Sequence, residues 1–182
     1  MLKNLQKERV AIYIDGSNFY NRLKEIGVLD GFEFDYKKFA EHLSRGRNLI
    51  SKRYYVGVVR NTDGSKKSEQ LVSGQQKFLK GLENEDYAIK RGKVIYSFGH
   101  TREKGVDVKI AADLIIGAID NIYDTAILVS SDTDLIPALN YVRYKNKGIE
   151  YVGFSHNPSF GLIKNSTKSI LLLPEDLQQF KK

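Results

Sequence analysis

The sequence predicts an α/β fold, a three-layer α/β/α sandwich around a mainly parallel sheet. Short runs of β-branched and aromatic residues alternate along the chain with segments of helical periodicity. This alternation is typical of parallel strands joined by helices that cover both faces of the sheet. The chain has 182 residues and contains no internal repeat or linker-like stretch. We therefore expect a single domain over residues 1–182.

Six short runs carry the strand signal, because they are dominated by residues that pack well on a pleated surface. These runs are residues 10–14, 54–59, 94–96, 125–129, 150–154 and 170–173. Apolar side chains recur at helical spacing in four further segments, at 17–26, 35–43, 68–82 and 106–119. The last of these is apolar almost all round, which predicts a buried helix.

Another helix is expected to begin near residues 132–134 and to stop at Gly148. An acidic residue suits the first helical turn, and Pro137 is tolerated there because the first N–H groups lack helical partners. Two stretches lie outside the regular elements. Residues 61–68 are expected to form an exposed basic loop, and residues 174–182 either a short closing helix or a frayed tail.

Composition excludes several classes of function. The chain has no cysteine, which removes disulfide scaffolds, thiolate zinc sites and cysteine nucleophiles. Its apolar runs are too short to cross a bilayer, and its first residues lack the apolar stretch of a secretory signal. We therefore expect a cytoplasmic protein with no membrane partner. The formal net charge of +7 favours a polyanionic partner, and nucleic acid is the commonest one.

Four aspartates fall where predicted strands end or helices begin. Asp15 follows the first strand directly. Asp132 and Asp134 follow the strand at 125–129, and Asp107 lies at the start of the most apolar helix. In open parallel sheets, ligands bind at the edge formed by the carboxyl ends of the strands. These four carboxylates are therefore expected to converge there from three separate segments.

Ionised carboxylates that converge need a cation, since two of them 4 Å apart repel by about 1 to 4 kcal/mol. Mg²⁺ or Mn²⁺ fits best, because hard divalent ions prefer carboxylate and water oxygens. Such an ion orients a water molecule and stabilises charge on a phosphate. There is also a purely structural interpretation, in which Asp107, Asp132 and Asp134 cap helices or occupy their first turns without chemistry.

Two further polar residues lie near these acids in the sequence. Asn18 comes three residues after Asp15, where it either caps a helix or holds a metal-bound water. Asp113 comes six residues after Asp107, which is about 600° of rotation on a helix, so the two should face different ways. We expect Asp113 to pair with Lys109 or to face solvent.

The segments that carry these acids resemble the signatures of a known family. Residues 13–18, 104–108 and 129–137 are similar to the three motifs of NYN-domain proteins, and closest to the LabA-like branch of the PIN-like nuclease superfamily. The resemblance covers about residues 9–154 and leaves 155–182 as a C-terminal extension. It implies a PIN-like fold and a metal-dependent endoribonuclease. The acidic and metal-ligating residues it implies are Asp15, Asp107, Asp132 and Asp134. Asn18 is a further catalytic residue, and Asp113 is a candidate for supporting the ligands without binding the metal itself.

Basic residues close to the acids are candidates for binding the phosphates of a substrate. Arg102 and Lys104 lie on the expected loop before the helix at 106–119, and Lys66 and Lys67 lie on the earlier basic loop. Contacts of this kind supply affinity without sequence preference. For Lys66 and Lys67, a solvated charged loop is an equal alternative. RNA is the expected partner, and the sequence is compatible with a homodimer.

Several functions remain open at this stage. The leading one is hydrolysis of single-stranded RNA by a metal-activated water. A phosphatase of the haloacid-dehalogenase type would use Asp15 as a nucleophile but needs an aspartate where this chain has Ser17. A Toprim-like site needs a glutamate on the first strand. The strongest rival is a non-catalytic RNA- or protein-binding regulatory module of the same fold.

Overall fold

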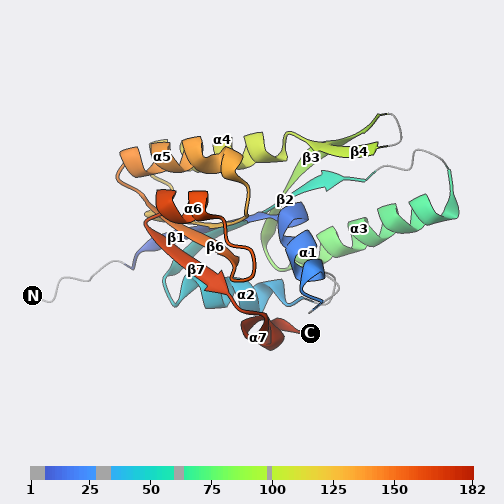
Figure 1. The fold of residues 1–182 in the computed structure, drawn as a ribbon, viewed down its shortest axis with the longest axis horizontal. Helices are drawn as coiled ribbons and strands as arrows, with labels where there is room; N and C mark the ends of the chain where they lie inside the picture. The colour runs from blue at the N-terminus through green and yellow to red at the C-terminus, as the bar shows by residue number, and fades with distance from the viewer. Residues whose placement is uncertain (1–6, 28–33, 60–63, 98–99) are drawn as a thin grey trace, which may run out of the picture.

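The computed structural model describes residues 7–27, 34–59, 64–97 and 100–182, with the backbone alone for residues 94–97 and 100–103. In this part of the chain, seven strands form one sheet in the order β4-β3-β2-β1-β5-β6-β7 (Figure 1). They are β1 (Arg9–Asp15), β2 (Asn48–Val58), β3 (Tyr87–Ser97), β4 (His100–Lys104), β5 (Thr125–Val129), β6 (Gly148–Phe154) and β7 (Lys168–Leu172). Only β4, at one edge, runs antiparallel to its neighbour. The predicted mainly parallel sheet is confirmed.

Helices cover both faces of the sheet, which confirms the three-layer architecture. They are α1 (Gly16–Glu25), α2 (Tyr36–Ser44), α3 (Lys66–Asn84), α4 (Val106–Ile119), α5 (Ile136–Tyr144), α6 (Phe160–Asn165) and α7 (Pro174–Leu177), with 3-10 turns η2 (Thr133–Leu135) and η3 (Gln178–Phe180). One face packs against α1, α2, α3 and α7, and the other against α4, α5 and α6. In Figure 1, α4 and α5 run along the upper side and α2 lies below. None of the helices described has both the length and the hydropathy that crossing a bilayer requires.

The central strand β1 contributes side chains to both cores. Val10, Ile12 and Ile14 point into the core beneath α1 and α2, whereas Ala11 and Tyr13 point into the core beneath α4 and α5. All five are 0% exposed. Because side chains alternate along a strand, only a strand buried on both faces reads as an unbroken apolar run. This is why the sequence located β1 well.

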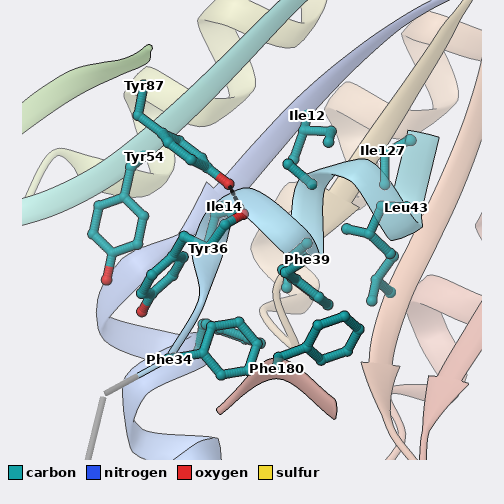
Figure 2. Close-up of a cluster of buried hydrophobic side chains, with 14 of the residues drawn as sticks. Ile12, Ile14, Phe34, Tyr36, Phe39, Leu43, Tyr54, Tyr87, Ile127 and Phe180 are labelled. Atoms are coloured by element: carbon teal, nitrogen blue, oxygen red, sulfur yellow. Dashed lines mark hydrogen bonds between the residues drawn. The ribbon is translucent and has the colours of Figure 1, made fainter. Parts of the chain in front are cut away.

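The core beneath α1 and α2 is rich in aromatic rings (Figure 2). The rings of Phe34 and Phe39 pack edge to face with centroids 5.2 Å apart, and Phe39 and Phe180 do the same at 5.2 Å. The Tyr87 hydroxyl donates a hydrogen bond to the Tyr36 carbonyl at 2.8 Å. Phe180 belongs to the C-terminal segment, which is therefore a closing helix packed into the core and not a frayed tail.

The order of the parallel strands creates a switch point in the middle of the sheet. From β1 the chain moves outward to β2 and β3, and it then returns to the other side of β1 to add β5, β6 and β7. The connections that leave the carboxyl ends of β1 and β5 therefore diverge on opposite sides. In open α/β sheets, this divergence opens the crevice in which ligands bind.

Several sequence expectations are wrong in detail. β2 and β3 begin earlier than expected, at Asn48 and Tyr87, and β4 was not expected at all. The basic stretch at 61–68 is not a loop throughout, because α3 begins at Lys66 after the cap residue Ser65. The helix α4 has the expected bounds but is not buried all round. Three of its apolar side chains face solvent: Val108, Ile116 and Ile119.

Candidate functional site

Asp15 is a buried carboxylate at the carboxyl end of β1. It is the last residue of the strand and also the N-cap of α1, with only 4% of its surface exposed. Its Oδ1 accepts a hydrogen bond from the Asn18 backbone N–H at 3.1 Å, and its Oδ2 accepts one from the Ser130 hydroxyl at 3.0 Å. Burial raises the pKa of the nearby Tyr54 phenol well above its ordinary value, and the charge on Asp15 adds to that shift.

Ser130 links Asp15 to the second acidic segment. Its buried hydroxyl donates to Asp15 and accepts a hydrogen bond from the Asp132 backbone N–H at 3.1 Å. Asp132 in turn caps η2, because its Oδ1 accepts a hydrogen bond from the Asp134 N–H at 2.9 Å. Asp132 is half-buried and Asp134 is exposed. The capping interpretation is therefore correct for the Asp132 side chain. The backbone N–H of the same residue shares the Ser130 hydroxyl with the Asp15 carboxylate.

A second set of hydrogen bonds joins α1 to the same turn. The Asn18 amide contacts Ser131 through both ends: its Oδ1 accepts from the Ser131 backbone N–H at 3.1 Å, and its Nδ2 donates to the Ser131 Oγ at 2.9 Å. The Arg22 guanidinium also reaches Ser131, with Nη2 3.2 Å from Oγ. Asn18 therefore ties the β1–α1 junction to the β5–η2 turn, on either side of the switch point.

Asp107 lies on the same edge of the sheet. It occupies the first turn of α4 with its side chain exposed, after Gly105, whose φ of 81° places it in the left-handed region that favours glycine. The start of α4 lies beside β3, because a Cβ on Gly92 would come within 2.5 Å of Val106. Since β3 is two strands from β1, this start lies about 10 Å to the side of Asp15.

Asp113 faces a different side of α4 from Asp107, as the helical geometry predicted. It does not pair with Lys109 or face open solvent. Its Oδ2 accepts a hydrogen bond from the Tyr55 hydroxyl at 2.7 Å and lies 3.2 Å from the Arg53 guanidinium and 3.6 Å from the Lys90 ammonium. Burial raises the pKa of Tyr55, and the hydrogen bond to Asp113 raises it further. Asp113 therefore anchors α4 to β2 and β3.

The four basic candidates fall on different elements from those expected. Arg102 and Lys104 belong to strand β4 and not to a loop. The side chain of Arg102 lies outside the described residues, and Lys104 is exposed. Lys66 and Lys67 form the exposed first turn of α3.

No three acidic or histidine side chains among the described residues lie close enough together to ligate one metal ion. The Ser130 hydroxyl instead connects the Asp15 carboxylate with the backbone N–H of Asp132, which brings these two residues together. Asp107 and Asp134 add exposed carboxylates at the same edge. The roles of all four as ligands stay predictions.

Sequence reasoning missed two contributors, Ser130 and Arg22. A small polar residue immediately after the four apolar residues that end β5 was a usable signal for Ser130, since a buried hydroxyl there needs partners. For Arg22 the signal was its spacing of four residues from Asn18, which places both on one face of a helix. The side chains of Asn18 and Arg22 both contact Ser131.

An α/β domain with acids gathered at its switch point is typical of a ligand-binding or catalytic protein of this architecture. The chain belongs to the NYN-domain family, whose model matches residues 9–173. The match extends past residue 154, where the sequence resemblance was expected to end, and takes in β7. Membership of this nuclease-like family agrees with the class of function that the sequence predicts.

Solved structures add information about the fold. A protein of unknown function from Vibrio parahaemolyticus is 23% identical, with a TM-score of 0.73, and the match covers 94% of this chain and 96% of that one. The flap endonuclease of bacteriophage T5, solved with DNA and metal ions, is 16% identical with a TM-score of 0.38 over 68% of this chain and 49% of that one. That second likeness is too weak to support a statement about this chain. A search of curated proteins found no match.

Proposed function

We propose that this protein is a metal-dependent endoribonuclease of the LabA-like branch, which hydrolyses phosphodiester bonds of single-stranded RNA. The observation that supports it best is the pair of hydrogen bonds through which Ser130 connects the Asp15 carboxylate with the Asp132 backbone at the switch point of the sheet. It brings together acids from two of the three motif segments, and Asp107 opens a helix at the same edge. Family membership supports a nuclease, and the net charge of +7 suits a polyanionic substrate.

The donor groups fit a hard divalent cation. All the acids offer oxygen ligands, and Mg²⁺ is commonly bound by one or two carboxylates together with water and substrate phosphates. Asp15 and Asp132 would hold Mg²⁺ or Mn²⁺, with Asp107 and Asp134 completing the donor set. When bound, the ion would neutralise charge that develops on the phosphate.

The chain's own residues would prepare the reaction in distinct ways. Asp15 receives two hydrogen bonds inside the protein, so its carboxylate is oriented before substrate arrives. Asp134 is exposed in η2, two residues after Asp132, and would accept a hydrogen bond from a water molecule. As the oxygen of that water bonds to phosphorus and the bond to the leaving oxygen breaks, a carboxylate oxygen of Asp134 would take the water's proton.

The test is cleavage of an end-labelled single-stranded RNA with Mg²⁺, Mn²⁺ or EDTA. Asp132→Asn should abolish metal-dependent products, whereas Asp120→Asn, an exposed aspartate at the end of α4, should cleave like the wild type. Addition of Mg²⁺ should also raise the melting temperature of the wild type and not of Asp132→Asn, because a ligand stabilises the state it binds. Equal cleavage by wild type and Asp132→Asn would refute the assignment.

One observation favours a second candidate, a non-catalytic RNA-binding module of the same fold. Among the described residues, no three-acid cluster is assembled in advance. This alternative predicts RNA binding that weakens with salt, with no products at any metal concentration.

A further inference from the structure

Arg22 is a basic side chain that hydrogen-bonds directly to the acidic site. It lies in the last turn of α1. Its Nε and Nη2 lie 3.4 and 3.2 Å from the Ser131 Oγ, and its Nη1 donates to the Glu25 Oε2 at 2.7 Å. Ser131 immediately precedes Asp132. A fixed positive charge therefore lies next to the turn that carries Asp132.

The surroundings of Arg22 extend this region toward β6. The Glu25 carboxylate lies 3.6 Å from the Nε2 of His156, which follows the end of β6. Burial raises the pKa of Tyr151 in β6, and the positive charge of Arg22 opposes that shift, so the guanidinium lies within electrostatic reach of this strand. Arg22 is therefore on the β5–β6 side of Asp15, whereas Lys104 lies on the far side, on β4.

The geometry of Arg22 suits an anion. A guanidinium has five N–H donors in a planar fork that matches phosphate oxygens. Three hydrogen bonds, to Ser131 and Glu25, use three of these donors, and 20% of the side chain remains exposed. Partial burial strengthens charge-assisted hydrogen bonds and reduces screening by salt. Glu25 is the more exposed partner, at 50%, and can move away from the guanidinium at little cost.

We propose that Arg22 binds a backbone phosphate of the single-stranded nucleic acid and that Glu25 competes with this phosphate for the guanidinium. The inference rests on the proposed function, because it names how the same site holds its substrate. The strand then runs from Asp15 and Asp132 across Arg22 toward the carboxyl end of β6. This path differs from the one along Arg102 and Lys104 that the sequence suggests.

The test is binding of a fluorescently labelled single-stranded RNA in EDTA, measured by anisotropy over a series of salt concentrations. Arg22→Gln should weaken binding about tenfold and reduce the slope of log K against log salt by about 0.7, the value for one phosphate contact on a single strand. The matched control is Lys24→Gln, which removes the same charge from an exposed position about 200° around the same helix. It should change affinity less than about twofold. Glu25→Gln should tighten binding.

The outcomes separate this proposal from the nuclease assignment. RNA and DNA of the same sequence share the phosphates that Arg22 would bind. Arg22→Gln should therefore lose affinity by the same factor for both. Three outcomes would overturn the phosphate site. They are equal losses of affinity in Arg22→Gln and Lys24→Gln, weaker binding by Glu25→Gln, and no RNA binding by the wild type. RNA binding with the expected variant pattern but without cleavage would leave the phosphate site standing and remove the nuclease. Cleavage by the wild type, together with an unchanged salt slope in Arg22→Gln, would support the nuclease and overturn the phosphate site.

Discussion

Replacement of Ser130 by alanine tests whether the hydroxyl between the two acids holds the site together. The serine is 3% exposed, donates to Asp15 at 3.0 Å and accepts from the Asp132 N–H at 3.1 Å. A hydrogen bond to a charged group contributes about 1.5 to 3 kcal/mol, and a buried N–H without a partner costs about 1 to 3 kcal/mol. Because the freed groups can partly relax, Ser130→Ala should lower the free energy of unfolding by about 2 to 4 kcal/mol.

The assay is urea denaturation followed by circular dichroism, with Ser44→Ala as the matched control. Ser44 is also buried, but its hydroxyl donates to the neutral carbonyl of Glu41 within α2, at 2.8 Å. Its loss should cost about 1 kcal/mol or less. A cost for Ser130→Ala no larger than that for Ser44→Ala would mean that the hydroxyl does not support the Asp15 carboxylate, and the reasoning about the bridged pair would fail.

Three other predictions concern ion pairs and packing elsewhere in the fold. The hydrogen bond from Arg9 lowers the pKa of Asp124 from 3.8 to about 2, so the stability this pair supplies is complete above pH 4 and is lost as the pH falls from about 4 to 2. Arg9→Gln should raise that pKa toward 3.8 in an NMR titration, and an unchanged value would contradict the assignment. Arg47→Met should destabilise the protein by about 3 to 5 kcal/mol in urea, because both oxygens of the buried Glu150 carboxylate accept from this guanidinium at 2.9 Å; a smaller loss would mean that the carboxylate finds other partners. In Gly16→Ala the new Cβ would lie 2.3 Å from a buried tyrosine ring of β2, so a loss of about 1 to 3 kcal/mol is expected from overpacking, and an unchanged melting temperature would show that the ring can move.

The parts of the fold that the sequence predicted well are those in which burial alone decides the structure. Residues 10–14 lie in a strand that is buried on both faces, and the segment 106–119 has the bounds of α4. Both are apolar because they contact the core over most of their length. The outer face of α4 could not be predicted, because nothing local distinguishes an apolar residue that packs from one, such as Val108, that is 71% exposed.

The parts of strands that the sequence missed contain basic residues whose partners are distant in the chain. In β2, the Lys52 ammonium lies 5.0 Å from the ring centroid of Tyr87, and Arg53 pairs with Asp113 on α4. Tertiary contacts thus stabilise strand residues that have a weak local preference for this conformation. The strand β4 is the extreme case, since its sequence is entirely polar and its conformation follows from pairing with β3.

The candidate site shows the same division, between features set by the ends of strands and features that require the whole fold. The position of Asp15 and Asp132 at one edge is set by the carboxyl ends of two parallel strands, and the sequence located both. The contacts of Ser130 and Arg22 depend on β1 and β5 being neighbours, a fact of strand order that no local pattern contains.

Strand order also explains why this edge can combine a rigid part with an adaptable one. The β1–α1 junction and the β5–η2 turn are fixed to each other by reciprocal hydrogen bonds between Asn18 and Ser131. The Asp15 carboxylate accepts one hydrogen bond from each of these segments, so it cannot reorient without breaking them. Asp107 and Asp134 lie on exposed first turns. On the proposed function, an arriving cation and phosphate would need to recruit only the exposed acids, because the fold has already ordered the buried one.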